Sequence, residues 1–210
     1  LRTEINVRAS TIIGAVGGGG IGETFRRSLS NDHPAKTYAI IILLLVLGAI
    51  VAVREKLGPI AILVNNAAND DRRKPMDIDE AYWDWSMNVN LKHQFFAAQA
   101  VMPGMRDMGG GSIVNFSSIA WRFGADDMTA YATAKAAVIG LTRALARNFG
   151  AHNIRVNAIE PGAVMTEKQR QKWYTKQEQI DAMVSRQKIR RVLTADEIAR
   201  REHADAGNLQ

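Results

Sequence analysis

Short runs of apolar residues recur along the chain, and glycine, proline or asparagine bounds each of them. Aliphatic and β-branched side chains dominate these runs, and their lengths suit buried strands. The runs that we predict as strands are STIIGAV at residues 10–16, IAILVNNAA at 60–68, GSIVNFSS at 111–118 and IRVNAIEPG at 154–162. A strand that is apolar on both faces is typical of a sheet that helices cover on both sides.

The segments between these runs have helical periodicity. Residues 78–107 carry large apolar side chains at four-residue intervals, namely Trp83, Met87, Leu91 and Phe95. Residues 129–149 are rich in Ala, Leu and Arg, and a further helix is expected over residues 21–30. Strands that alternate with helices predict an α/β fold with a doubly wound parallel sheet. No linker or repeat divides the chain, so we expect a single domain over residues 1–210.

The segment between Gly22 and Asn65 does not follow this alternation. A doubly wound sheet would place three helices and two strands there, on the order of 60 residues, but the segment (23–64) has only 42. We therefore expect residues 31–56 to be irregular, and the C-terminus to stop where a closing strand is due. The apolar run at residues 39–53 is shorter than the ~20 residues of a membrane span, and we interpret it as buried core.

Composition and charge exclude several kinds of protein. The chain has no cysteine and only four histidines, which rules out thiolate chemistry, and we expect no metal. Its net charge of +6 is spread along the sequence, and the densest cluster, residues 168–191, also contains acids and glutamines. We therefore expect neither nucleic acid nor a membrane as a partner. The first ten residues lack the apolar stretch of a secretory signal, so we expect a cytoplasmic protein.

A glycine-rich turn follows the first predicted strand and precedes a predicted helix. Glycines at such a turn allow the backbone to approach a pyrophosphate, which the N–H groups at the helix start can bind. The residues concerned are Gly18, Gly19, Gly20, Ile21 and Gly22. A flexible loop is the alternative, but the strand–glycine–helix context favours dinucleotide binding.

Polar residues follow three later strands, at the strand ends where ligands bind in an open parallel sheet. Residues 65–70 (NNAAND) could pin neighbouring loops or form a plain Asx turn. Ser117 and Ser118 could face one crevice or cap the next helix. Residues 161–166 (PGAVMT) offer backbone groups for a planar carboxamide, and Thr166 offers a hydroxyl for a phosphate or amide.

Tyr131 and Lys135 lie four residues apart in a predicted helix. Side chains at this spacing leave the same face, with Cβ atoms about 5–6 Å apart. A cation beside a phenol favours the phenolate and lowers the phenol pKa from about 10. The pair could therefore supply a general base, although Tyr and Lys are also common helix residues with no shared role.

Taken together, these motifs resemble the short-chain dehydrogenases/reductases. The glycine turn, NNA, N, Ser, YxxxK and PG occur in the order of that family, and the likeness covers residues 10–30 and 57–195. The resemblance implies a Rossmann-type fold and NAD or NADP as cofactor, with NAD slightly preferred. It also implies a catalytic set of Asn90, Ser118, Tyr131 and Lys135.

The same resemblance assigns a role to each of these residues. Tyr131 would be the general acid/base, Lys135 would lower its pKa and bind the nicotinamide ribose, and Ser118 would hold the substrate oxygen. Asn90 would support a proton-relay water. The remaining cofactor contacts that the resemblance implies are Asn66, Ala67, Pro161, Gly162, Val164 and Thr166.

A narrower resemblance is to the branch of this family that oxidises aldoses at C1 to lactones. It lies in LVNNAANDDRR, VNLKHQFFAAQAVMPGMR, SIAW and KQRQKWYT. Sugars stack on aromatic rings and form hydrogen bonds through their hydroxyls, so we expect Trp121 or Trp173 as a platform. Asn69 and Asp70 would supply polar contacts. Trp121 could equally be core packing, and Asp70 part of a solvated turn.

Three other functions stay open at this point. A 3-ketoacyl or other carbonyl reductase of the same family would use the same catalytic residues on an apolar substrate. A non-catalytic dinucleotide sensor need not keep Ser118, Tyr131 and Lys135 together. A nucleic-acid-binding role would rest on net charge alone.

The two long predicted helices also bear on assembly. They carry apolar or small residues beyond a single stripe, including Phe95, Phe96, Ala97, Ala98, Ala144 and Ala146. A helix that is apolar around much of its circumference is buried on more than one side. We therefore expect a homodimer or homotetramer.

Overall fold

The computed structural model describes residues 35–200, with side chains from residue 45 onwards. The chain divides into two compact units, the first ending at Ile159 and the second beginning at Glu160. The expected single domain over residues 1–210 stays a prediction. The first predicted strand, the glycine turn (Gly18, Gly19, Gly20, Ile21 and Gly22) and the helix after it lie outside the described residues.

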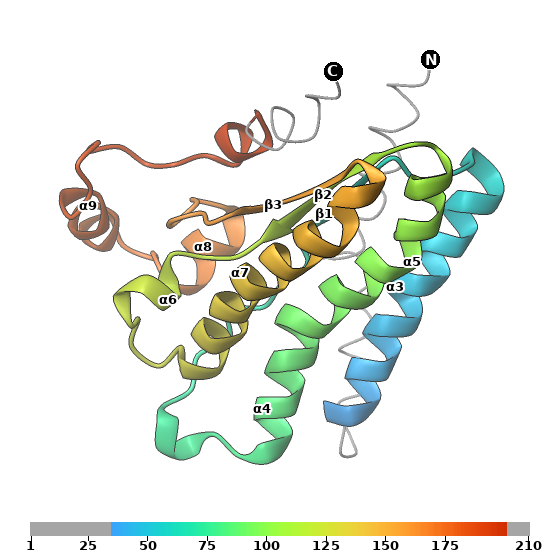
Figure 1. Ribbon diagram of the computed structural model, residues 1–210. Helices are drawn as coiled ribbons and strands as arrows, with labels where there is room; N and C mark the ends of the chain where they lie inside the picture. The colour runs from blue at the N-terminus through green and yellow to red at the C-terminus, as the bar shows by residue number, and fades with distance from the viewer. Residues whose placement is uncertain (1–34, 201–210) are drawn as a thin grey trace. The chain divides into compact units, whose positions relative to one another are not determined.

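The described part of the first unit contains a three-stranded parallel sheet in the order β1-β2-β3 (Figure 1). The strands are β1 (Ile62–Asn65), β2 (Gly111–Phe116) and β3 (Ile154–Ile159). All three lie within the predicted runs, and β2 is buried along its whole length. Because Asn65 pairs with Asn115 and Asn115 with Ala158, the carboxyl ends of the strands are level at one edge of the sheet.

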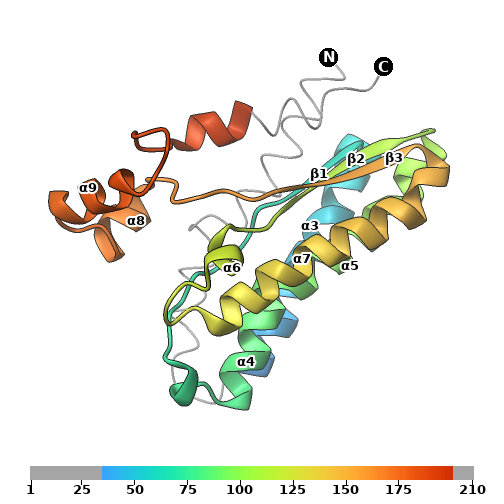
Figure 2. The same ribbon diagram turned by 60° about the vertical axis from the view of Figure 1, so that its left-hand side comes forward.

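Two long helices, α5 (His93–Asp107) and α7 (Thr129–Phe149), pack against one face of this sheet in the first unit (Figure 2). The π-helical turn η2 (Asn88–Lys92) continues α4 (Glu80–Met87) into α5, and the short helices η1 (Pro75–Asp77), α6 (Ala120–Phe123) and η3 (Gly150–His152) lie between the longer elements. Residues 78–107 are thus helical almost throughout, and α7 has the predicted bounds. These elements confirm the α/β fold with a parallel sheet.

The segment that interrupts the alternation is a single helix, α3 (Ala35–Leu57). It stands where the doubly wound pattern requires several elements, and from Ala35 onward the segment is one helix. The expectation for residues 31–56 as a whole stays a prediction, because residues 31–34 lie outside the described residues. One face of α3 belongs to the core, because Ile50 and Val53 are buried in the same cluster as Leu63. The other face is not core, since Val51 is 50% exposed. Within residues 35–200 no helix is both long and apolar enough to span a membrane.

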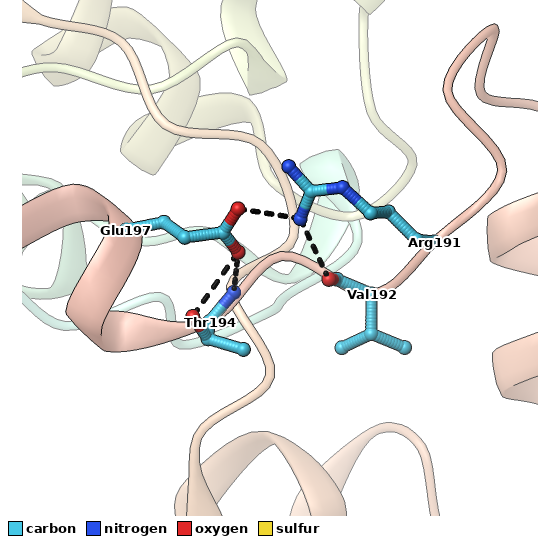
Figure 3. Close-up of polar contacts among 4 residues, drawn as sticks. All are labelled: Arg191, Val192, Thr194 and Glu197. Carbon is cyan, nitrogen blue, oxygen red and sulfur yellow. Dashed lines mark hydrogen bonds and ion pairs between the residues drawn. The ribbon is translucent and has the colours of Figure 1, made fainter.

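The second unit consists of short helices and extended segments. Thr166 caps α8 (Glu167–Lys172), α9 (Gln177–Ser185) follows, and a further helix begins at Ala195. The start of that last helix is held by Glu197, whose carboxylate accepts hydrogen bonds from the Thr194 N–H at 2.9 Å and hydroxyl at 3.1 Å (Figure 3). Arg191 forms an ion pair with the same carboxylate at 2.5 Å. The hydrogen bond from the Thr194 N–H is the main reason that the pKa of Glu197 lies below its usual value.

Candidate active site

Hydrogen bonds between side-chain amides connect the carboxyl ends of β1 and β2. Asn65 Nδ2 donates to Asn115 Oδ1 at 2.9 Å, and Asn115 Nδ2 donates to Thr142 Oγ1 of α7 at 3.0 Å. The Thr142 hydroxyl in turn donates to the Val138 carbonyl at 2.8 Å. All three side chains in this chain of bonds are buried. It fixes α7 against the strand ends, and α7 is the helix that carries Tyr131 and Lys135.

Lys135 is the largest side chain that is fully buried, with 1% of its surface exposed. Its Nζ donates to the Phe116 carbonyl at the end of β2, at 2.7 Å. Burial lowers the pKa of Lys135 to about 8, because an apolar environment penalises the charged form. In the described part of the chain Phe116 is its one recorded acceptor, so an ammonium with three donors has capacity left for a ligand hydroxyl.

Tyr131 lies one turn before Lys135, with its ring centroid 5.7 Å from the Lys135 Nζ. Burial raises the pKa of Tyr131 to about 12, while the Ser118 hydroxyl lowers it and the Asp70 carboxylate raises it further. The expectation that Lys135 holds this pKa below 10 is therefore wrong for the chain by itself. The physical reason is that burial penalises the phenolate, and the lowered pKa of Lys135 leaves that side chain largely neutral at the pH where the phenol titrates. The phenol is accordingly poised as an acid.

The two serines after β2 have different partners. Ser117 is buried, and its hydroxyl donates to the Lys135 carbonyl at 2.7 Å, so it ties the strand end to α7. The Ser118 oxygen accepts from the Ala120 N–H at 3.1 Å and so caps the turn that begins α6. Ser118 also lies beside Tyr131, as its effect on the pKa of that phenol shows. Both readings of Ser118, as a cap and as a site residue, are therefore compatible with its position.

Asn90 lies in the π-helical turn η2 between α4 and α5. Its side chain donates to the Ser86 carbonyl at 3.0 Å and accepts from the Asn69 backbone N–H at 2.9 Å. Asn90 thus anchors the start of the segment that follows β1. Single turns of π-helix are frequent at functional sites, and this one brings Asn90 to the edge of the sheet where Tyr131 lies.

The predicted substrate residues of the first unit border the same place. Asp70 is half-buried and close enough to Tyr131 for its charge to raise the phenol pKa. Trp121 lies in α6, three residues after Ser118, with the Arg122 guanidinium 4.5 Å from its ring centroid. The structure therefore brings Asp70 and Ser118 together at Tyr131, and it places Trp121 on the helix that begins beside them.

A buried histidine that sequence reasoning did not single out lies next to this cluster. His93 is 3% exposed, and burial together with the charge of Lys135 lowers its pKa to about 4. Neither ring nitrogen, nor the Oε1 atom of the neighbouring Gln94, has a hydrogen-bond partner of good geometry among the described residues. His93 is therefore neutral near pH 7. Its sequence signal is weak, because one histidine on a helix is usually a core residue.

The described residues of the first unit fit a dinucleotide at the strand ends. The buried donor Lys135 and the small residue Ala67, just after β1, both lie at the edge where such a ligand binds. Asn66, also just after β1, is exposed there. Pro161, Gly162, Val164, Thr166 and Trp173 belong to the second unit, where Val164 bridges to Leu193 and Thr166 accepts from the Gln169 N–H. Their parts in binding stay predictions. Among residues 35–200 no group of side chains could hold a metal ion.

Several residues that shape the site were not predicted from the sequence. Thr142 and Ser117 orient α7, and Tyr82 fixes the segment after β1 through a hydrogen bond from its hydroxyl to the Asp71 carbonyl at 3.1 Å. A signal existed for Tyr82, because Asp79 three residues earlier is a good N-cap residue and accepts from the Tyr82 N–H. Nothing in the sequence pairs Thr142 with Asn115.

Comparison with known proteins identifies the family of the chain. A family model described as enoyl-(acyl carrier protein) reductase matches residues 46–201. The chain is 53% identical over 143 residues to a "probable galactose dehydrogenase" of Rhizobium meliloti, covering 68% of this chain and 56% of that protein. It is 53% identical over 129 residues to a D-xylose 1-dehydrogenase of Caulobacter vibrioides, covering 61% and 52%. The chain thus spans about half the length of these curated relatives.

A solved structure gives the same answer for the fold. A candidate short-chain alcohol dehydrogenase of Sinorhizobium meliloti superposes with a TM-score of 0.72 at 37% identity, over 76% of this chain and 63% of that one. The predicted Rossmann-type fold is thereby confirmed. The predicted catalytic residues of the first unit, Asn90, Ser118, Tyr131 and Lys135, gather at one edge of its sheet.

Proposed function

This chain belongs to the short-chain dehydrogenase/reductase family, and from that premise we propose that it oxidises the C1 hydroxyl of an aldose to a lactone. The observation that carries the substrate class is the Asp70 carboxylate beside Tyr131. A carboxylate beside Tyr131 would bind sugar hydroxyls well, because its oxygens accept hydrogen bonds. It would suit the apolar chain of a ketoacyl substrate less well, because packing apolar groups against a carboxylate costs desolvation free energy. The names of the two curated relatives agree with this choice.

The chemistry of the proposed reaction falls to three side chains. Ser118 holds the C1 oxygen, and Tyr131, once its own phenolic proton has left to solvent, takes the proton of the C1 hydroxyl as the phenolate. When bound, NAD or NADP supplies the acceptor for the hydride that leaves C1. Below about pH 8 Lys135 keeps its positive charge close to the Tyr131 ring, and this charge favours removal of the phenol proton. In the reverse direction Tyr131, with its high pKa, returns the proton as a general acid.

The proposed cofactor contacts are those that the family resemblance implies. Lys135 would hold the nicotinamide ribose, Asn66 and Ala67 the adenosine ribose, and the glycine turn (Gly18, Gly19, Gly20, Ile21 and Gly22) the pyrophosphate. Pro161, Gly162, Val164 and Thr166 would meet the carboxamide. We propose NAD over NADP, and the affinity ratio of the two cofactors, measured by quenching of protein fluorescence, tests that preference.

Assembly is part of the proposal. Phe95 remains 38% exposed on α5, and Ala144 is exposed on α7, although both helices already bury one face against the sheet. Apolar surface left on two neighbouring helices is what a second copy of the chain would cover. We propose a homodimer or homotetramer, for which a monomer in light scattering at micromolar concentration is the contrary result.

Steady-state assays of reduced cofactor test the proposed reaction. D-xylose, L-arabinose, D-galactose and D-glucose are compared with acetoacetyl thioesters in the reductive direction, each with both cofactors. We expect at least one aldose to be oxidised. Turnover of the thioesters and of no aldose would keep the catalytic residues but overturn the substrate class.

Tyr131→Phe tests the catalytic assignment in the same assay. We expect a 10²–10⁴-fold loss of kcat with little change in cofactor affinity, since that is what a general acid or base typically supplies. Thr133→Ala is the matched control, because it removes a hydroxyl from an exposed position of the same helix. A Tyr131→Phe enzyme with more than about a tenth of the activity would contradict the assignment.

A further inference from the structure

The segment that carries Asp70 is tied down on both sides of that residue. Before it, the Asn69 N–H donates to the Asn90 side chain at 2.9 Å. After it, the Asp71 carbonyl accepts from the Tyr82 hydroxyl at 3.1 Å. A residue whose two neighbours are both anchored has little backbone freedom, so these two bonds restrict the positions from which the Asp70 side chain can extend.

Tyr82 is the larger of the two anchors. It is 7% exposed in α4, and its own N–H is held by Asp79, the N-cap of that helix, at 2.7 Å. Burial raises the pKa of Tyr82, so its hydroxyl keeps its proton and remains a donor at alkaline pH. The Trp85 ring lies against it with centroids 5.4 Å apart. A phenol held in this way is a rigidly placed hydrogen-bond donor for the segment that follows β1.

Arg73 links Tyr82 to the loop that follows α6. The Arg73 guanidinium lies 4.0 Å from the centroid of the Tyr82 ring, and the Arg73 backbone N–H donates to the Asp127 carbonyl at 2.8 Å. Asp127 has a φ of 56°, a left-handed conformation that aspartate tolerates better than most residues. The segments after β1 and after α6 therefore lie side by side at this edge (Figures 1 and 2).

We propose that Tyr82, assisted by Arg73, is a positioning residue that holds Asp70 on the substrate side of Tyr131 and thereby sets selectivity for polyhydroxylated substrates. For an aldose the proposal rests on the proposed function. A carboxylate on an anchored segment presents its oxygens to substrate hydroxyls at one place. A carboxylate on a mobile segment would lose conformational entropy each time the substrate binds.

Kinetics of three variants in the full chain test the selectivity. Tyr82→Phe removes only the hydroxyl, and Arg73→Met removes the guanidinium but keeps an apolar stem. We expect each to raise the aldose KM about threefold to tenfold, the range for one lost hydrogen bond in Tyr82→Phe and for one lost cation–π contact in Arg73→Met, with kcat and the cofactor KM within about twofold. Arg73→Lys should recover most of the loss of Arg73→Met. Arg106→Met, which removes an exposed arginine paired with Asp107 on α5, is the control.

A double-mutant cycle separates positioning from a merely structural role. The groups that face Tyr131 are Asp70, Ser118 and Lys135. Asp70→Asn should lower the pKa of Tyr131, which moves to lower pH the rising limb of the profile for oxidation and the falling limb for reduction, and Tyr82→Phe should move the same limb in the same direction. The double variant should move it no further, because both changes act through one carboxylate.

Additive shifts, or an unchanged profile and KM in Tyr82→Phe, would overturn the proposal. So would a parallel fall of kcat, kcat/KM and thermal stability, which is what a folding defect produces. The cycle is read with whichever alcohol or carbonyl compound the wild-type chain turns over. Absence of aldose oxidation in the wild type would therefore refute the proposed function, and the cycle would still decide whether Tyr82 positions Asp70.

Discussion

The buried ammonium of Lys135 predicts an unusual dependence of stability on pH. Its pKa falls from 10.5 to about 8 in the folded chain, so the unfolded chain holds this proton more tightly. Between about pH 8 and 10.5 the unfolded state therefore binds more protons, and the free energy of unfolding rises with pH. Each pKa unit is worth about 1.4 kcal/mol, so the full rise is about 3 kcal/mol. Below about pH 8 the cost of burying the charge is constant.

Lys135→Met removes this titration while keeping a side chain of similar length. The variant leaves the Phe116 carbonyl without its donor, which costs about 1–3 kcal/mol at every pH. The difference in unfolding free energy, wild type minus variant, should therefore grow by about 3 kcal/mol from about pH 8 to 10.5. Subtracting the variant also removes the contribution of other groups, among them Tyr131, that titrate at alkaline pH.

Urea denaturation at a fixed protein concentration, followed by circular dichroism across this pH range, measures that difference. Lys92→Met serves as the baseline for losing one positive charge at an exposed position of the same region. A difference between wild type and Lys135→Met that is flat, or that shrinks as the pH rises, would refute the reasoning. In that case Lys135 would be charged in the folded chain throughout, and the account of the high Tyr131 pKa would fail with it.

Three further predictions follow from particular contacts. Thr142→Val should lower the free energy of unfolding by about 1–3 kcal/mol in urea titrations, because it leaves the buried Asn115 amide without its acceptor. Thr142→Ser keeps the hydroxyl and should lower that free energy clearly less. Gly110→Ala should destabilise the chain by about 1–3 kcal/mol, since an added Cβ would lie 2.8 Å from the Asn153 backbone oxygen. A melting temperature equal to that of the wild type would contradict this prediction. Glu197→Gln should speed hydrogen exchange at residues 195–200, because a neutral amide is a weaker acceptor for the Thr194 N–H and a poorer partner for Arg191. Unchanged exchange would show that the Glu197 carboxylate does not stabilise the start of that helix.

Local sequence was sufficient for the elements that pack regularly. Alternation and helical spacing are properties of neighbouring residues, and they located β1, β2 and β3 within the predicted runs and gave α7 its bounds. The order of the motifs around Ser118, Tyr131 and Lys135 was likewise enough to indicate the family. These features depend on spacing along the chain, which a sequence states directly.

The segment before β1 shows where local patterns stop. Counting residues predicted that residues 31–56 could not hold the expected elements, but it did not predict that α3 would be one continuous helix. A uniformly apolar run has no periodicity that separates helix from strand. What separates them is packing, in which Ile50 and Val53 join the core cluster and Val51 does not.

Only the tertiary structure decided how the site behaves. The sequence placed Lys135 one turn from Tyr131 and implied a lowered phenol pKa, whereas burial of both groups reverses that direction. The hydrogen bonds that anchor the segment around Asp70, from Asn69 to Asn90 and from Arg73 to Asp127, join residues far apart in the chain. Spacing along a helix determines which side chains can meet, but desolvation and long-range anchoring depend on everything that packs around them, and no local pattern contains that information.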